Sequence, residues 1–94
     1  MSYELVFKEE ALKEWAKLDS SVREQFKKKL KQRLTNPIIE SCRLNGMKNY
    51  YKIKLLSAGY RLVYEVRETE VVVAVIAVGK RERNAVYKAA IKRI

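Results

Sequence analysis

The sequence predicts an α+β domain in which two helices near the N-terminus pack against an antiparallel sheet. Three observations support this prediction. Two segments with helical spacing, residues 9–18 and 21–34, follow one short alternating segment at residues 2–8. A hairpin pattern occupies residues 50–66, and a continuous apolar run at residues 71–78 comes next. The expected order is therefore β-α-α-β-β-β-α in two layers, with residues 1–94 forming a single domain.

The N-terminal third is predicted to form a strand and a helical hairpin. Tyr3, Leu5 and Phe7 alternate with polar residues, as in a half-buried strand. The first helix has a stripe of residues expected to be buried: Ala11, Leu12, Trp15 and Leu18. Ser21 and Glu24 have the spacing of a capping box that starts the second helix. That helix is expected to bury residues at steps of four: Val22, Phe26, Leu30 and Leu34.

The predicted outer face of the second helix is strongly basic, since it carries Lys27, Lys28, Lys29, Lys31 and Arg33. Such a face is usually solvated, and the alternative is a docking surface for phosphate backbones. The whole chain has 21 Lys and Arg against 11 Asp and Glu, and its net charge of +10 favours polyanionic partners. Nucleic acid, an acidic protein and anionic lipid remain open. Lipid is the weakest of the three, because the longest apolar run is far too short to span a bilayer.

The hairpin organises the chain because its two faces have opposite chemistry. Only one parity buries the apolar residues of both arms together: Ile53, Leu55, Leu62 and Tyr64. That parity gathers three cations on the opposite face, namely Lys52, Lys54 and Arg61. Like charges on neighbouring strands repel by roughly 0.2–1 kcal/mol per pair unless an anion lies between them. We interpret this face as a phosphate site; the alternative is a solvated face that happens to be basic.

The last strand and the last helix are expected to complete this site. The apolar run at residues 71–78 is typical of a central strand covered on both faces. Arg81 follows it closely and should project from the edge of the sheet where loops gather. Asn84 is the expected cap of a short helix with an apolar side comprising Val86, Tyr87, Ala90, Ile91 and Ile94. Tyr87 either packs there as a core aromatic or reaches over the cations.

The composition excludes several kinds of catalytic site. The chain has no histidine and a single cysteine, Cys42, so it cannot form a zinc site of the usual ligands or a Ser-His-Asp or Cys-His nucleophile. Asp19 is the only aspartate, which disfavours a two-metal nuclease centre, and no metal or cofactor is expected. The single cysteine and the lack of a signal-peptide pattern favour the cytoplasm. Catalysis would therefore depend on Lys, Arg, Tyr and Glu.

Four segments carry a resemblance to a known family: Tyr-Lys-Ile-Lys-Leu at 51–55, Gly-Tyr-Arg-Leu-Val-Tyr at 59–64, Val-Gly-Lys-Arg-Glu-Arg at 78–83 and Val-Tyr at 86–87. Together they resemble the RelE toxins of bacterial toxin-antitoxin systems, in the wider RelE/ParE superfamily, and the resemblance covers essentially the whole chain. It implies a compact RelE-like fold and an endoribonuclease that enters the ribosomal A site and cuts the mRNA codon there. The superfamily fold alone is weaker evidence, because ParE members share it and poison DNA gyrase instead.

The resemblance also implies an active-site set, which is Lys52, Lys54, Arg61, Arg81 and Tyr87. Many close relatives have an arginine where this chain has Asn45, which puts a phosphate or base contact there in doubt. The implied partners are a cognate RelB-like antitoxin, mRNA and the 70S ribosome with its 16S rRNA, and no membrane. Candidate RNA contacts outside the active-site set are Lys27, Lys28, Lys31, Lys80 and Arg83.

Cleavage of RNA without a metal requires a base for the 2′-hydroxyl, charge stabilisation at phosphorus and a proton for the leaving 5′-oxygen. A lysine, with its usual pKa of about 10.4, acts as a base only when that pKa is lowered, as neighbouring cations lower it. Our hypothesis is Lys54 as base, Lys52 and Arg61 as clamps, Arg81 as stabiliser or proton donor, and Tyr87 as an orienting group that can stack on a base. A ParE-like gyrase binder and a non-cleaving RNA-binding module remain the alternatives.

Overall fold

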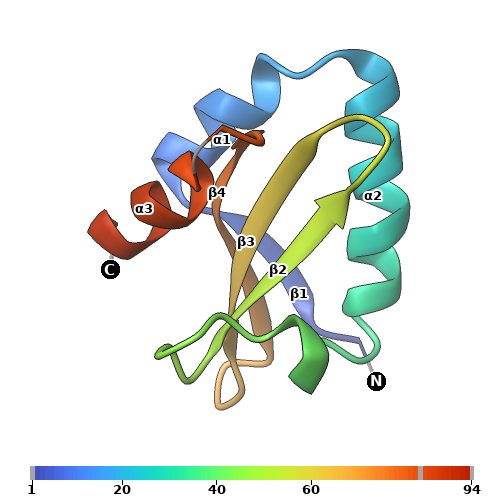
Figure 1. Ribbon diagram of the computed structural model, residues 1–94. Coiled ribbons are helices and arrows are strands. Elements are labelled where there is room, and N and C mark those ends of the chain that lie inside the picture. Colours follow the sequence, from blue (N-terminus) through green and yellow to red (C-terminus); the bar gives the residue numbers. More distant parts are fainter. Residues whose placement is uncertain (1, 83, 94) are drawn as a thin grey trace.

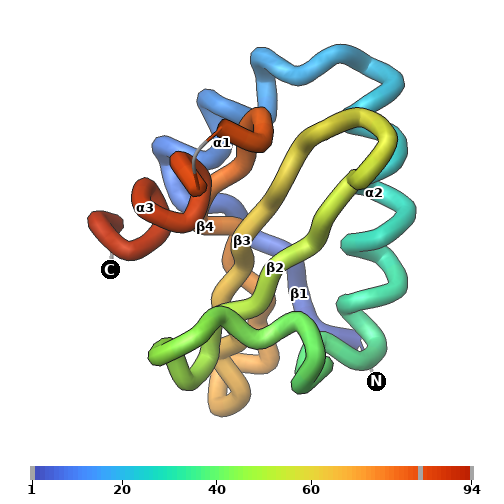
Figure 2. The backbone as a smooth tube through the Cα atoms, viewed as in Figure 1, coloured from blue at the N-terminus to red at the C-terminus, as the bar shows by residue number. Residues whose placement is uncertain are grey.

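The computed structural model describes residues 2–82 and 84–93, and its path is shown in Figure 1 and Figure 2. The elements, in chain order, are β1 (Glu4–Phe7), α1 (Glu9–Ala16), α2 (Ser20–Arg33), a short 3-10 helix η1 (Glu40–Cys42), β2 (Tyr50–Leu55), β3 (Tyr60–Arg67), β4 (Val72–Lys80) and α3 (Ala85–Lys92). The predicted α+β class and element order are confirmed, with η1 added between the helical pair and the hairpin. Within the described ranges, no helix is long and apolar enough to cross a membrane.

The sheet is mixed, because its first strand runs parallel to its neighbour. The strand order is β1-β4-β3-β2, and the three consecutive strands pair antiparallel as expected. β1 lies along the outer edge of β4 in parallel, with Phe7 opposite Val75. The helical pair α1 and α2 returns the chain to the start of β1, where the Tyr3 amide donates to the Leu34 carbonyl at 2.8 Å. The next strand, β2, therefore runs in the same direction as β1, and so does β4, two antiparallel pairings later.

Helices cover both faces of the sheet, so the prediction of two layers missed a third. α1 and α2 cover one face, where Phe26 and Leu30 pack in a buried cluster with residues such as Ile53. On the opposite face α3 buries Val86 and Ala90 in a second cluster formed with all three long strands. Figure 1 shows α3 on the side of the sheet away from α2, as a partial third layer.

A bulge in β4 determines which of its side chains face α3. Val63 pairs with Ala77 and the next residue of β3, Tyr64, pairs with Val75, so Ile76 is the extra residue. Ile76 and Ala77 consequently both belong to the α3-side cluster, whereas Val75 and Val78 belong to the other. Strict alternation along this run predicts neither the bulge nor the face on which the following residues lie.

Three local expectations about the helices are wrong. α2 begins at Ser20 with Asp19 at the N-cap position, so the capping box of Ser21 and Glu24 does not form. Leu12 is 53% exposed and does not join the buried stripe. In the last helix Ile91 is 56% exposed, so the apolar side of α3 is narrower than predicted. α1 and α3 have only eight residues each and pack mainly on β4; α1 buries Ala11, and α3 buries Val86 and Ala90. Ile94 lies outside the described residues.

Arg33 also differs from the prediction, since it turns to the sheet and not outward with the lysines of α2. Its Nη1 donates to the Tyr64 hydroxyl at 2.9 Å, and that hydroxyl donates to the Pro37 carbonyl at 2.7 Å. The Tyr64 ring stacks on Tyr51 at a centroid distance of 5.6 Å, and Arg43 lies 5.0 Å from the Tyr51 centroid. Burial raises the pKa of Tyr64, which keeps its hydroxyl a neutral donor. This stack joins the end of α2 to the hairpin.

Removing the Tyr64 hydroxyl should therefore destabilise the fold. Tyr64→Phe leaves the Pro37 carbonyl without its donor and removes the shortest hydrogen bond of Arg33, which keeps only the longer contacts to the Lys52 carbonyl at 3.4 Å and to Cys42 Sγ at 3.5 Å. We expect a loss of about 1–2 kcal/mol in the free energy of unfolding, measured by urea denaturation followed by circular dichroism. Tyr60→Phe, at a half-buried tyrosine of the same strand, is the control and should cost less. Equal stabilities for Tyr64→Phe and the unmodified protein would contradict the assignment.

Candidate active site

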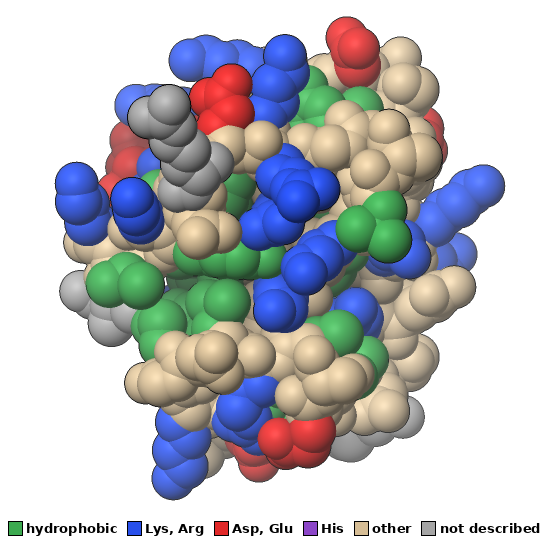
Figure 3. All heavy atoms as spheres, in the orientation of Figure 1, with side chains coloured by type: hydrophobic (Ala, Val, Ile, Leu, Met, Phe, Trp, Pro, Cys, Tyr) green, Lys and Arg blue, Asp and Glu red, His purple; other side chains and the backbone are tan. Residues whose placement is uncertain are grey.

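The β2–β3 hairpin builds a basic face in the register that the sequence predicts. Lys54 lies directly opposite Arg61, and Ile53 lies opposite Leu62. Ile53 and Leu62 are buried under the helical pair, so the side chains of Lys52, Lys54 and Arg61 lie on the other face. Lys54 and Arg61 thus form a cross-strand pair of like charges, which repel each other in the absence of an anion. Figure 3 shows basic side chains gathered over β2 and β3 in the middle of this face.

α3 places Tyr87 against two of these cations. Arg61 Cζ lies 5.2 Å from the centroid of the Tyr87 ring, and Lys52 Nζ lies 5.9 Å from it. Both distances fit cation–π attraction. The ring also packs against the second buried cluster, which Val86 and Ala90 of α3 form with residues of the strands. The two interpretations of Tyr87 are therefore both correct, because it is partly a packing residue and partly a cover of the basic face.

Asn84 contributes to this face in a way that its sequence position did not predict. It does occupy the N-cap position of α3, but it adopts a left-handed conformation with φ 61° and makes no side-chain capping bond to the described residues. Its Oδ1 instead accepts a hydrogen bond from Arg61 Nη1 at 3.4 Å. Arg61 is consequently held between Asn84 and Tyr87, at the first turn of α3. A sequence pattern identifies a cap residue by type and position, and carries no sign of this contact.

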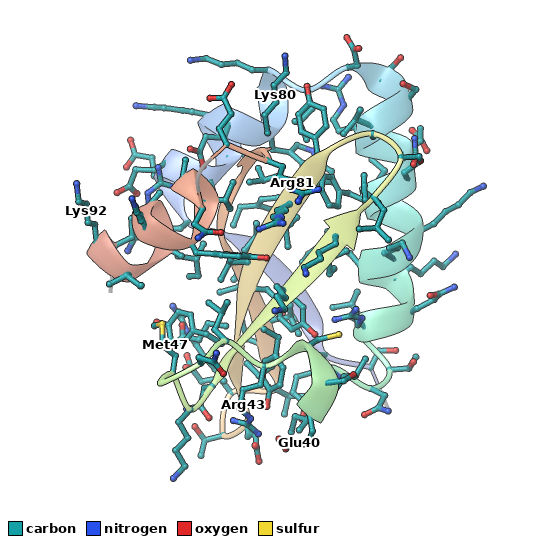
Figure 4. All side chains as sticks on the ribbon, in the orientation of Figure 1. Glu40, Arg43, Met47, Lys80, Arg81 and Lys92 are labelled. Carbon is teal, nitrogen blue, oxygen red and sulfur yellow. The ribbon has the colours of Figure 1, made fainter. Side chains whose placement is uncertain are left out.

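Arg81 reaches the same region from the end of β4. Its backbone amide donates to the Gly59 carbonyl at 2.7 Å, which ties it to the hairpin turn. Its side chain is exposed, and Figure 4 shows it near the start of β3. Lys80 lies opposite Tyr60, whose ring packs against the helical pair, so Lys80 is on the other face of the sheet. Figure 4 accordingly shows Lys80 at the end of the sheet beside α1, away from the candidate active site.

The Tyr87 hydroxyl is a buried proton donor close to Arg61. Burial raises its pKa, and the positive charges of Arg61 and Arg81 oppose that shift only in part. The oxygen is buried and has no hydrogen-bond partner among the residues that the structure describes. A buried hydroxyl without a partner costs roughly 1–3 kcal/mol. A phosphate or ribose oxygen that reached it would remove this cost and accept a hydrogen bond from a neutral phenol.

A cavity of about 400 Å³ lies beside Tyr87, between α3 and the loop at residues 44–47. It is lined by Leu44, Asn45, Met47, Lys52, Asn84, Tyr87, Lys88 and Ile91. Figure 4 shows Met47 on that loop, on the side nearest α3. Asn45 is thus a wall residue of a cavity next to the candidate active site. Within the described part of the chain, no cluster of three or more His, Cys, Asp or Glu could hold a metal ion.

The basic residues of α2 form a separate surface. Lys27, Lys28 and Lys31 are exposed on this helix, which covers the opposite face of the sheet. Lys27 forms an ion pair with Glu24 at 3.4 Å, and both side chains remain largely exposed to solvent. Arg83, the remaining candidate RNA contact, falls outside the described residues. The structure therefore brings together Lys52, Lys54, Arg61, Arg81 and Tyr87, and leaves the α2 lysines and Lys80 apart from them.

Comparisons with known proteins agree on one family. The family model described as the ParE toxin of a type II toxin-antitoxin system, parDE, matches residues 5–85. The chain is 62% identical over its full 94 residues to the mRNA interferase toxin RelE of Escherichia coli strain K12, of which it covers 99%. A mutant of E. coli toxin RelE in the free state has a TM-score of 0.92 and 60% identity, with 100% of this chain and 99% of that chain covered. A chain of the intact E. coli RelBE toxin-antitoxin complex has a TM-score of 0.84 and 61% identity, over 87% of this chain and 100% of that one.

The buried position of Tyr87 predicts that its phenol ionises above the ordinary pKa of about 10. Since the folded-state pKa is raised, any stability linked to this proton is complete below the unfolded pKa and is lost as the pH rises through the folded pKa. The titration is measured as the difference in near-ultraviolet absorbance between the unmodified protein and Tyr87→Phe. A midpoint at or below the ordinary tyrosine value would show that the hydroxyl is solvated.

Proposed function

Because the chain belongs to the ParE toxin family and is 62% identical over its full length to an mRNA interferase toxin RelE, we propose that it is the toxin of a type II toxin-antitoxin system and an mRNA interferase, an endoribonuclease that stops translation. One observation carries the enzymatic part of the proposal: two cations lie against the Tyr87 ring. Lys52 Nζ is 5.9 Å and Arg61 Cζ is 5.2 Å from the centroid of this ring. A buried phenol set against two cations, with no geometrically sound hydrogen bond to the described residues, supports a role beyond RNA binding. The whole chain, residues 1–94, acts in this proposal as one toxin domain.

The scissile phosphate would bind between the strands of the hairpin and α3. Lys54 and Arg61 face each other across the strands, so an anion between them relieves their repulsion. In our assignment Lys54 is the general base for the 2′-hydroxyl, and Lys52 and Arg61 stabilise the charge that develops at phosphorus. These groups supply base and charge without a metal ion.

Arg81 and Tyr87 would act on the leaving-group side. Arg81 is exposed at the end of β4, where it can stabilise the leaving 5′-oxygen or donate a proton to it. Tyr87 already contacts Lys52 and Arg61 through its ring, so its first role is to orient these cations and the RNA. A tyrosine is neutral at physiological pH and burial raises the pKa of Tyr87 further, so its hydroxyl can donate a hydrogen bond to the bound RNA.

We propose that cleavage depends on the ribosome. An arginine is a poor proton donor and a lysine a poor base near neutral pH, so the free protein should be a slow nuclease. The A site would bend the mRNA for in-line attack and supply much of the missing rate through positioning. The partners in this proposal are the 70S ribosome with its 16S rRNA, mRNA and a RelB-like antitoxin. The site of action would accordingly be the cytoplasm.

The proposal predicts ribosome-dependent cuts that need Arg81 and Tyr87. Primer extension on an mRNA in a reconstituted translation system should show codon-phased cleavage, and almost none when ribosomes are omitted. Arg81→Ala and Tyr87→Phe should slow cleavage by about 10²-fold, the lower range for a group that handles protons or charge in the transition state. Lys13→Ala removes an exposed charge on α1 and is the matched control.

A different pattern would favour the gyrase-binding alternative. If the mRNA stays intact while DNA supercoiling by gyrase fails in a parallel assay, the basic face is a binding surface and not an active site. Vigorous degradation of naked RNA by the pure protein would instead contradict the dependence on the ribosome.

The α2 surface is expected to contact ribosomal RNA. Reversing two of its charges, Lys28→Glu with Lys31→Glu, should weaken binding to empty ribosomes by roughly ten-fold or more at low salt, since each neutralised phosphate releases counterions. The matched control is Lys13→Glu with Lys17→Glu, which changes the net charge equally on the exposed surface of α1. Binding to the antitoxin should change less. Equal effects of the two double variants on ribosome binding would show that only net charge matters.

A further inference from the structure

Glu14 and Arg93 join the first and last helices at the edge of β4. Arg93 Nη1 donates to Glu14 Oε1 at 2.8 Å, and Arg93 Nη2 donates to Glu14 Oε2 at 3.1 Å. The same Nη1 donates to the Ile76 carbonyl at 2.9 Å, and Glu14 Oε1 also accepts the Val78 amide at 3.2 Å. Figure 2 shows the segments that carry the pair, α1 in blue and α3 in red, on the same side of the molecule.

The pair occupies the place of a missing strand. β1 ends with Phe7 opposite Val75, so the next residues of β4 have no strand on that side. Ile76, the bulge residue, presents its carbonyl there, and Val78 presents its amide. A guanidinium satisfies the carbonyl and a carboxylate satisfies the amide. This stretch of backbone therefore needs one donor and one acceptor, which Arg93 and Glu14 supply.

α3 depends on this contact more than a longer helix would. Its eight residues are too few to be stable alone in water. Its N-cap residue, Asn84, makes no side-chain capping bond within the described ranges, and its fully buried side chains are the small residues Val86 and Ala90. Arg93 stands at the C-cap position, six residues after Tyr87, where a positive charge also complements the helix dipole.

We propose that Glu14 and Arg93 are positioning residues for the cleavage reaction: their ion pair fixes α3 on the sheet and so holds Tyr87 against Lys52 and Arg61. The inference rests on the proposed function. The pair is suited to this task because it is bidentate and sheltered, with side-chain exposures of 18% for Arg93 and 34% for Glu14. Neither residue lies on the basic face, so each acts on the reaction through α3.

The first test measures the helix without reference to activity. In Arg93→Ala, amide hydrogen exchange in α3 should accelerate by about ten-fold or more, while exchange in β3 and the core of β4 stays unchanged. Lys92→Ala is the matched control, because it removes an exposed charge from the adjacent position of the same helix. Unchanged exchange of α3 in Arg93→Ala would overturn the proposal even if cleavage were never detected.

The second test separates positioning from general destabilisation. Arg93→Ala should lower the single-turnover cleavage rate at saturating protein by about 10- to 100-fold, as a misplaced catalytic group does, and leave the half-saturating concentration unchanged. Arg93→Lys should recover part of this loss, because it keeps the charge and loses the fork. Glu14→Gln should add little to Arg93→Ala if the two residues act as one unit, with Glu9→Gln as its control.

The route through Tyr87 gives the decisive result. In a Tyr87→Ala background, which lacks both the ring and the hydroxyl, Arg93→Ala should reduce the rate by much less than it does in the unmodified protein, because the group that it positions is already gone. Independent, multiplicative losses would overturn the proposal and leave the ion pair a purely structural contact. If the unmodified protein makes no cut while exchange of α3 responds to Arg93→Ala, the failure lies with the proposed function and not with the anchoring of the helix.

Discussion

The pairing register of the β2–β3 hairpin is the constraint on which the rest of the structure depends. With Ile53 opposite Leu62, the apolar side chains of both strands lie under α1 and α2. The same register sets Lys54 against Arg61 on the other face. A slip of one residue would bury these charges and expose the apolar side chains, so burial of the core enforces the pairing of like charges. The fold thus assembles the basic face through the energy that stabilises its core.

α3 supplies contacts that reduce the repulsion among these cations in the free protein. The Tyr87 ring lies near Lys52 and Arg61, and Asn84 accepts a hydrogen bond from Arg61, so the cations have weak local partners in place of an anion. Weak partners leave room for a stronger one. A phosphate that entered would offer a full negative charge to the same groups.

Periodicity in the sequence predicted which side chains lie on each face of the hairpin, but it largely failed to predict which helices and strands contact each other. The alternation in Tyr50–Leu55 and Tyr60–Arg67 was sufficient for the hairpin and for the convergence of Lys52, Lys54 and Arg61. It could not place β1 beside β4, because a short half-buried strand carries no mark of its partner. It missed the bulge at Ile76, since every residue of that run is apolar and suits either face. Glu14 and Arg93, 79 positions apart, are two ordinary charges in the sequence. Tyr87 entered the candidate active site through family resemblance, because helical spacing alone favoured a core residue.

The two basic surfaces bear on the kind of partner that fits the chain. Lys27, Lys28 and Lys31 are exposed on α2, whereas the hairpin cations lie on the face of the sheet that α3 covers, and the two surfaces approach each other where Lys29 and Lys54 line one cavity. The Debye length at physiological ionic strength is about 8 Å, so charges farther apart than this on the two surfaces are matched by separate phosphates. A single strand of RNA in the candidate active site would use only the hairpin face and leave the α2 lysines solvated. A partner that presents phosphates on both sides, as a cleft walled by structured RNA does, would use both, and the distribution of charge therefore favours a substrate held inside a larger RNA assembly over free RNA.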